Sequence, residues 1–302
     1  MHGAREKILV PGGHSFRVLR WRQSLRDVEC VVAPNQLQSL TGEGAHWHFH
    51  VAMELTLFTS GEGTRFVGDQ IGSFAAGDLV LLGENLPHYW HTRGASSGIS
   101  VQWHFPEGHA FWVFPENLVL AGLFKQASRG LRFSGNTATA VAKLLQELPR
   151  SAGPSQLAIL MTILARLSTA VESERRFLSL RSFALSEESH HQQAITGAVR
   201  HIIAHFRDEV RMPDLLRVTG MSRATFARQF KTHSGRTFSD FLNRLRLQAA
   251  CRELKESERS ILDIAMTSGF TQLSFFNRLF RRELKCSPTE FRLKSRKGPA
   301  RK

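Results

Sequence analysis

The sequence predicts an α+β protein, in which an antiparallel β-sandwich or β-barrel, with helices after it, precedes an all-α region. Three observations support this prediction. Short alternating apolar runs fill residues 16–114, a helical period of about 3.6 begins near residue 116, and short helices fill residues 194–292. A chain of 302 residues with 42% apolar composition is long enough for two well-packed domains.

The first region has the pattern of paired strands. Alternating runs occur at residues 54–58, 64–67, 78–82 and 99–105, and glycine-containing turns separate them at residues 60–63, 76–77 and 93–94. Short strands at near-regular spacing with turns between them are typical of an antiparallel sandwich or barrel. We therefore expect the strands of this region to close around an interior.

The second region has a helical pattern. A short helix is predicted for residues 136–148, and a longer one begins near Gly153-Pro154-Ser155. One face of the longer helix carries an apolar stripe of Leu157, Leu160, Met161, Leu164, Leu167 and Val171. Such a stripe packs either on the helix's own barrel or on a second copy of the chain. We expect a homodimer, because symmetric pairs are the commonest oligomers.

The charge is concentrated at the end of the chain. Residues 190–302 contain 23 basic and 10 acidic residues, whereas residues 1–189 contain 17 basic and 16 acidic residues. A neutral first part and a strongly basic second part indicate a sensor or catalytic domain joined to a domain that binds a polyanion. The three cysteines are too few and too widely spaced for a disulfide framework, which favours a reducing cytosol.

The basic region contains one structural plan twice. A short helix, a turn at Gly220 and a serine N-cap at Ser222 precede a helix over residues 223–231, and the same plan recurs with the turn at Gly269, 49 residues later. Each second helix has a pair of phenylalanines four residues apart, namely Phe226 with Phe230 and Phe276 with Phe280. A helix, a glycine turn and a helix with a polar outer face are typical of a helix-turn-helix that binds DNA.

About 100 residues of this region resemble the AraC/XylS family of bacterial transcription regulators. The resemblance is carried by Arg246-Leu-x-x-Ala250, Ile261-x-x-Ile264-Ala265, Gly269-Phe270, Phe276-x-x-x-Phe280 and Ser287-Pro288-x-x-Phe291-Arg292. The family uses two such motifs to contact successive major grooves on one face of DNA. The chain departs from the family at Leu216, where a small alanine is favoured, and at Lys285, where glycine is common.

The resemblance implies a set of residues that contact DNA. Base-facing positions would be Ala224, Ala227 and Arg228 in the first motif and Leu273, Ser274, Asn277 and Arg278 in the second. Arginine reads guanine and asparagine reads adenine in the major groove. The remaining predicted DNA-binding residues are Ser222, Arg223, Lys231 and Arg281. Lys231, Arg281 and the adjacent Arg282 are better placed to contact phosphates than bases.

The first region is similar to the cupin β-barrels, and this resemblance implies a β-barrel of the jelly-roll type. The resemblance is carried by Gly42-x5-His48-x-His50-x3-Glu54-x6-Gly61 and, in part, by Gly77-x5-Gly83 followed by Pro87-His88. It implies a candidate divalent metal ion held by His48, His50, Glu54 and His88, since imidazole and carboxylate are suitable ligands. Thr92, Gly83 and Asn85 depart from the second motif of the family.

A pocket for a small polar or sugar-like effector is the other interpretation of these residues, and it is compatible with a metal. The pocket would contain His48, His50, Glu54, His88 and Trp90. Trp47 and Trp103 also lie near the histidines in the sequence, and aromatic faces stack on sugars. They are equally ordinary barrel-core residues.

The predicted organisation has four parts: an effector-binding and dimerisation domain at residues 1–181, a linker at 182–192, the DNA-binding domain at 193–293 and a basic tail at 294–302. The predicted function is a one-component, sequence-specific transcription regulator in the cytoplasm, with no catalytic residues and no membrane span. Its expected partners are double-stranded DNA, a small-molecule effector, RNA polymerase and a second copy of the chain. The alternative is a metal-dependent cupin enzyme with a basic nucleic-acid-binding appendage.

Overall fold

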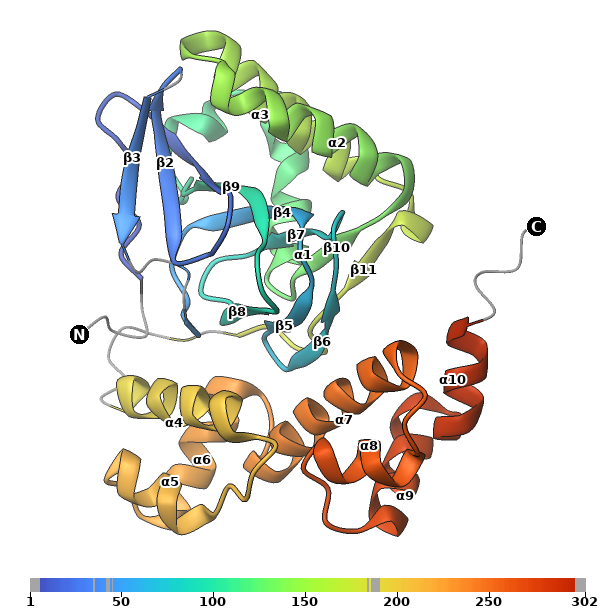
Figure 1. Ribbon diagram of the computed structural model, residues 1–302. Helices are drawn as coiled ribbons and strands as arrows, with labels where there is room; N and C mark the ends of the chain where they lie inside the picture. The colour runs from blue at the N-terminus through green and yellow to red at the C-terminus, as the bar shows by residue number, and fades with distance from the viewer. Residues whose placement is uncertain are drawn as a thin grey trace. The chain divides into compact units, whose positions relative to one another are not determined.

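The computed structural model describes residues 6–34, 36–41, 44, 46–183, 185 and 191–296, and it divides the chain into two compact units, Met1–Gln193 and Ala194–Lys302 (Figure 1). We call these the N-terminal unit and the C-terminal unit. Gly42 of the first barrel motif, residues 184 and 186–190 of the predicted linker and residues 297–302 of the predicted tail lie outside the described residues. Each helix within the described residues is too short or too polar to cross a membrane.

The N-terminal unit contains two antiparallel sheets. The larger sheet has the order β11-β10-β7-β4-β9-β1-β2-β3, and the smaller has the order β6-β5-β8. The larger sheet consists of β1 (Phe16–Trp21), β2 (Asp27–Ala33), β3 (Gln36–Thr41), β4 (Met53–Ser60), β7 (Leu79–Leu82), β9 (Ser97–Trp103), β10 (Leu131–Phe133) and β11 (Arg175–Phe177). The smaller sheet consists of β5 (Gly63–Val67), β6 (Gln70–Phe74) and β8 (His88–Thr92).

The two faces of the larger sheet have different partners, as the alternation of its strands requires. On β4, Leu55 and Leu57 belong to the apolar core that the sheet forms with the helices. Glu54 and Thr56 point the other way and line the space between the two sheets, where an apolar cluster of both sheets surrounds them. The sandwich therefore encloses an interior to which β4 contributes the polar residues Glu54 and Thr56.

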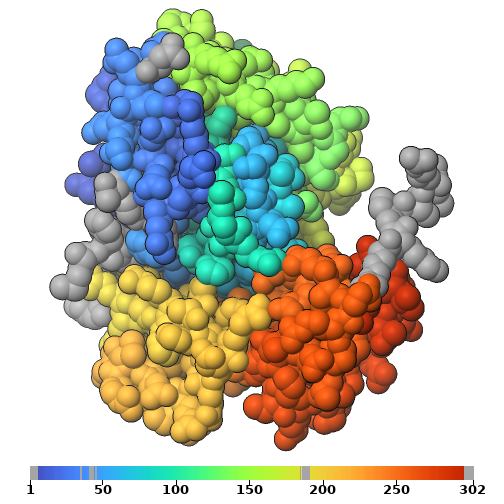
Figure 2. All heavy atoms as spheres, viewed as in Figure 1, coloured from blue at the N-terminus to red at the C-terminus, as the bar shows by residue number. Residues whose placement is uncertain are grey.

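The helical layer covers the outer face of the larger sheet (Figure 1). It contains the short 3-10 helices η1 (Ala110–Val113) and η2 (Pro115–Val119) and the α-helices α1 (Leu120–Ala127), α2 (Gly135–Glu147) and α3 (Gly153–Ser168). Two further 3-10 helices are η3 (Leu148–Arg150) and η4 (Glu172–Glu174). Figure 2 shows α2 and α3 on the surface of this unit.

The apolar stripe of α3 is part of this core. Leu160, Leu164 and Leu167 are fully buried against the sheet and α2, while Leu157 is 43% exposed. Val171 lies beyond the end of α3. The stripe therefore packs on its own barrel, and the expectation that it pairs two copies of the chain is wrong.

The start of α2 is capped from a distant part of the chain. The Glu174 carboxylate accepts hydrogen bonds from the backbone N–H groups of Asn136 at 2.7 Å and Thr137 at 3.0 Å. These N–H groups have no partner within the helix, so the carboxylate replaces an N-cap side chain. Strands β10 and β11 pair beside this cap, with Leu131 opposite Phe177.

The residues after β11 pack on the sandwich. Leu178 and Phe183 join the interior apolar cluster, and Leu185 is buried against Phe49. The Asp69 carboxylate accepts from the Ser179 hydroxyl at 2.8 Å. Phe183 and Leu185, which the sequence analysis assigns to a polar linker, are therefore buried in the N-terminal unit because their apolar side chains cover one end of it.

The C-terminal unit is helical. Its helices are α4 (Gln192–His205), α5 (Met212–Thr219), α6 (Arg223–Ser234), α7 (Phe238–Glu256), α8 (Ile261–Thr267), α9 (Leu273–Leu284) and α10 (Pro288–Arg296). The expected serine cap is present at the start of α6, where the Ser222 hydroxyl accepts from the N–H of Thr225. Lys285 ends α9 in the left-handed conformation with φ 56°, which explains why glycine suits this position.

The segment after α4 is fastened to α7 and to the second motif. The Arg246 guanidinium donates to the carbonyls of Phe206 at 2.7 Å and Asp208 at 2.8 Å. Gly269 lies against the same groups, because a β-carbon there would be 2.6 Å from the Phe206 oxygen and 2.7 Å from the Arg246 Nε. A side chain at position 269 is therefore excluded by contact as well as by its φ of 95°.

Candidate functional site

The two predicted recognition helices, α6 and α9, are built alike. Each buries a pair of phenylalanines, with ring centroids 5.3 Å apart for Phe226 and Phe230 and 5.4 Å apart for Phe276 and Phe280. Burying these rings sets the rotation of each helix, so that the intervening positions turn outward. Arg228 and Arg278 occupy the same position in the two helices and are both exposed.

Most of the predicted DNA-binding residues are exposed on these outward faces. The exposed ones are Ser222, Arg223, Ala224, Ala227, Arg228 and Lys231 of the first motif and Ser274, Arg278 and Arg281 of the second. Asn277 is half-buried, and Leu273 packs partly against the apolar core of the second motif. Part of the Leu273 side chain therefore packs in the core beneath α9, and the rest lies near the outer face of the helix. Phe275, which is not among the predicted residues, is 37% exposed beside Ser274.

Three histidines meet in the interior of the N-terminal unit. Ligand atoms of His48, His50 and His88 all lie within 4.8 Å of one another, and all three side chains are buried. His48 forms a backbone bridge with His88, which begins β8, whereas Glu54 lies on β4. The predicted residues are thus brought together, although His48 and His50 precede β4 and do not share a strand with Glu54.

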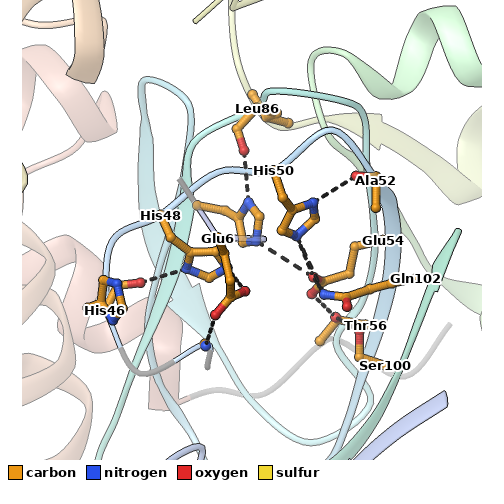
Figure 3. A network of polar contacts seen from close by, with 12 residues as sticks. Glu6, His46, His48, His50, Ala52, Glu54, Thr56, Leu86, Ser100 and Gln102 are labelled. Carbon is orange, nitrogen blue, oxygen red and sulfur yellow. Dashed lines mark hydrogen bonds and ion pairs between the residues drawn. The ribbon is translucent and has the colours of Figure 1, made fainter. Parts of the chain in front are cut away.

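The histidine rings have one orientation in common. The Nδ1 atoms of His48, His50 and His88 lie 2.7, 2.8 and 2.8 Å from the backbone carbonyls of His46, Ala52 and Leu86 (Figure 3). A carbonyl only accepts hydrogen bonds, so each Nδ1 carries a proton, and a ring with that one proton presents the lone pair of Nε2. This arrangement is the one that orients metal-binding histidines in proteins.

Glu54 lies at the centre of the polar contacts. Its Oε2 is 3.1 Å from His50 Nε2 and 3.7 Å from His88 Nε2, and it accepts a hydrogen bond of 2.6 Å from the Gln102 amide. The Arg17 Nε donates to the Gln102 carbonyl at 2.6 Å, which sets the direction of that amide. Arg17 and Gln102 come from the neighbouring strands β1 and β9, and the sequence analysis predicted neither of them.

Glu6 is a further acidic residue of this site that the sequence analysis missed. Its Oε2 lies 3.3 Å from His48 Nε2, and its Oε1 accepts from the Gly44 N–H at 2.9 Å (Figure 3). The Glu6 N–H donates to the carbonyl of Phe49, which lies between His48 and His50. We call Glu6, His48, His50, Glu54 and His88 the histidine cluster.

The ionisation of the cluster reflects its burial. Burial lowers the pKa of His48, although the Glu6 carboxylate partly opposes this effect. Burial would raise the pKa of Glu54, but the contacts with His50 and His88 outweigh it and hold that pKa well below its usual range. The pKa of Glu6 is also lowered, because the neighbouring His48 and His50 side chains and the Gly44 N–H outweigh its burial. Both carboxylates are therefore ionised near neutral pH.

The donor set fits a divalent cation. The Nε2 atom of His88 is buried without a hydrogen-bond partner among the described residues. Three protonated imidazoles would repel one another, since their ring centroids are only 4.2 to 5.7 Å apart. Neutral imidazoles instead turn lone pairs toward the carboxylates, and a cation between them removes that repulsion. Imidazole and carboxylate together suit zinc, iron, nickel, cobalt or manganese.

A small cavity adjoins the cluster. It has a volume of about 40 Å³ and is lined by Glu6, His48 and Glu54 on its polar side and by Trp21, Phe58 and Trp90 on its apolar side. The indole N–H groups of Trp21 and Trp90 are buried without an acceptor among the described residues. Of the three predicted tryptophans, only Trp90 lines the cavity, because Trp47 packs near Phe66 and Trp103 faces the helical layer.

Comparison with known proteins connects these features with a family. Residues 215–294 match the model of a helix-turn-helix domain. The chain is 25% identical over 246 residues to the HTH-type transcriptional activator RhaS of Escherichia coli. The aligned region covers 81% of this chain and 86% of the relative. The chain is a homologue of AraC-type transcription activators. This match supports a DNA-binding transcription regulator rather than a cupin enzyme with a basic appendage.

Two solved structures are also similar to the chain. The AraC-type DNA-binding domain-containing regulator from Chromobacterium violaceum is 27% identical, with 35% of this chain and 96% of that chain covered and a TM-score of 0.33. ToxT from Vibrio cholerae is 14% identical, with 93% of this chain and 98% of that chain covered and a TM-score of 0.34.

Proposed function

We propose that this chain is a one-component regulator that binds double-stranded DNA through α6 and α9 and senses a small polar effector in the N-terminal unit. The observation that supports the DNA contacts most strongly is the matching construction of α6 and α9. Their exposed residues recur 50 positions apart, as with Arg228 and Arg278. The excess of basic residues in residues 190–302 is a second support, since phosphate contacts contribute much of the affinity for DNA.

Arg278 and Lys231 provide the test of these contacts. Arg278→Ala should cost about 1–3 kcal/mol of operator binding and relax the preference at one base pair, because arginine reads guanine bidentately. Lys231→Ala should weaken binding to operator and random DNA alike, because a phosphate contact carries no sequence information. Gel shifts with both DNAs at several salt concentrations measure this. An unchanged ratio of operator to random affinity for Arg278→Ala would exclude it as a base reader.

The effector would bind in the cavity beside the histidine cluster, with a divalent metal held by His48, His50, Glu54 and His88. The unpaired indole N–H groups of Trp21 and Trp90 favour an effector that carries acceptor oxygens. A volume of about 40 Å³ holds about three water-sized groups. A metal with small oxygen ligands fits this space, whereas a sugar-sized effector requires the cavity to widen. A bound metal would supply a positive charge that attracts such oxygens.

The wider organisation follows the same proposal. In this proposal the effector domain is the N-terminal unit, Met1–Gln193, and the DNA-binding domain is the C-terminal unit, Ala194–Lys302. The chain acts in the cytoplasm without enzymatic activity, and RNA polymerase is its partner at the promoter. A homodimer is supported by exposed apolar residues of the N-terminal unit outside the stripe, which include Phe114, Leu118 and Val119. Sedimentation of the purified chain tests it.

A further inference from the structure

We propose that Glu6 is a fifth protein ligand of the metal in the histidine cluster, so that the cluster binds a divalent cation with three imidazole nitrogens and two carboxylates. This inference rests on the metal proposed above for His48, His50, Glu54 and His88. It adds a ligand that lies 42 residues before the first of the histidines in the chain.

The position of Glu6 is set by its contacts with the histidine segment. Its N–H donates to the Phe49 carbonyl at 2.9 Å, and one of its carboxylate oxygens accepts from the Gly44 N–H at 2.9 Å. The other oxygen is thereby directed at His48 Nε2, 3.3 Å away. The Glu6 side chain is about 10% exposed, and the distance of 3.3 Å leaves no room for a water between the carboxylate and the ring.

The contact between Glu6 and His48 is difficult to satisfy without a cation. The Nδ1 of His48 lies 2.7 Å from the His46 carbonyl and must carry a proton. A neutral ring then turns the Nε2 lone pair toward a carboxylate oxygen, and two lone pairs repel. A metal ion bound by both groups satisfies the lone pairs together.

Five protein donors favour particular cations. Structural zinc sites are almost always four-coordinate, whereas manganese, iron, cobalt and nickel accept five or six ligands with mixed nitrogen and oxygen donors. Five protein ligands leave one position of a six-coordinate ion for an oxygen from the adjoining cavity. The cluster is therefore suited to a cation of this second group that also contacts a ligand in the cavity.

Cobalt binding to the full-length chain tests the proposal. Metal is removed with a chelator, Co²⁺ is titrated back, and the visible spectrum reports both the affinity and the coordination of the ion. We expect one Co²⁺ per chain with the weak bands of a five- or six-coordinate ion. Glu6→Gln should bind Co²⁺ about 10–100-fold more weakly and change the spectrum, as the loss of a group that tunes a metal site does.

Two further variants separate ligation from charge and from folding. Glu84 lies 3.3 Å from the Nδ1 of His104 in an exposed pair outside the cavity, so Glu84→Gln is a matched control that should bind Co²⁺ as the wild type does. Glu6→Asp keeps the charge but withdraws the carboxylate by one methylene group, and it should bind with intermediate affinity. Tryptophan fluorescence during urea denaturation confirms that each variant is folded.

The outcomes are distinct. Wild-type affinity and spectrum in Glu6→Gln would overturn the proposal and leave the four-residue site in place. An unchanged Co²⁺ spectrum in Glu6→Gln together with weaker binding would show that Glu6 acts through its charge alone, which also overturns it. A wild-type chain that binds no Co²⁺ would overturn the metal and the fifth ligand together. In that case an unchanged gel shift with operator DNA would leave the DNA-binding function standing.

Discussion

Gly269 and Gly220 occupy the same position in the two helix-turn-helix motifs, but their surroundings differ. Both have positive φ, at 95° and 66°, so alanine is strained at either position. No atom lies within 4 Å of a β-carbon built at Gly220. At Gly269 the same β-carbon would collide with the Phe206 oxygen and with Arg246. We predict that Gly269→Ala is much more destabilising than Gly220→Ala.

The expected magnitudes follow from these contacts. The left-handed conformation costs an alanine about 1–2 kcal/mol, which is the whole cost expected for Gly220→Ala. In Gly269→Ala the Arg246 guanidinium must also move, and its two hydrogen bonds to carbonyls contribute about 2–3 kcal/mol together after allowance for their partial exposure. The free energy of unfolding of the C-terminal unit should therefore fall by about 3–5 kcal/mol. With a urea slope of about 2 kcal/mol per molar, the midpoint falls by about 2 M.

The distribution of tryptophan allows the two units to be followed separately. All five tryptophans, at positions 21, 47, 90, 103 and 112, belong to the N-terminal unit. Urea denaturation followed by tryptophan fluorescence should be the same for both variants and the wild type, while the helical circular dichroism signal of Gly269→Ala should be lost at lower urea. Equal midpoint shifts in the two variants would refute the reasoning, because only Gly269 has the contact with Arg246.

Three other predictions use different parts of the chain. Leu164→Arg should unfold the N-terminal unit, as measured by fluorescence, because burying a charge in that core costs several kcal/mol, whereas Leu157→Arg at the exposed end of the stripe should leave it folded. Burial raises the pKa of Cys251 to about 12, so at pH 8 Cys251 is a thiolate in roughly one molecule in ten thousand. Mass spectrometry after maleimide treatment should therefore find the less buried Cys286 modified before Cys251. Glu54→Ala combined with His88→Ala should abolish metal binding and the response to effector while operator affinity stays within a few-fold. A double variant that no longer binds DNA would show that these side chains maintain the fold.

The parts of the fold that could be predicted are those that depend on the spacing of residues close together in the sequence. Periodicity located α3 and the strand β4, and the spacing of Phe226 with Phe230 and of Phe276 with Phe280 established which faces of α6 and α9 turn outward. Periodicity does not reveal what covers an apolar face. The stripe of α3 is the same whether a sheet or a second chain lies on it, which is why the dimer expectation at this position was wrong.

The candidate site was predictable only where its residues lie close together in the sequence. The spacing of His48, His50 and Glu54 indicated a common site, and the structure brings them together with His88. Gln102 joins them because it pairs with Glu54 in the register of β4 and β9, and no local pattern records that register. Glu6 is beyond prediction for the same reason, since it reaches the cluster through one backbone hydrogen bond to Phe49.

The cap that Glu174 places on α2 has a consequence for how the N-terminal unit opens. Strands β10 and β11 pair at the two ends of the segment that contains α2 and α3, and the Glu174 carboxylate links its last part to the first turn of α2. The segment thus closes on itself, and its strand pairing with the rest of the sandwich is the three-residue match of β10 with β7. Residues joined in this way open together rather than one helix at a time. The amide hydrogens of α2 and α3 should then exchange with solvent as one cooperative block, while those of β4 and β9 remain protected until the whole unit unfolds.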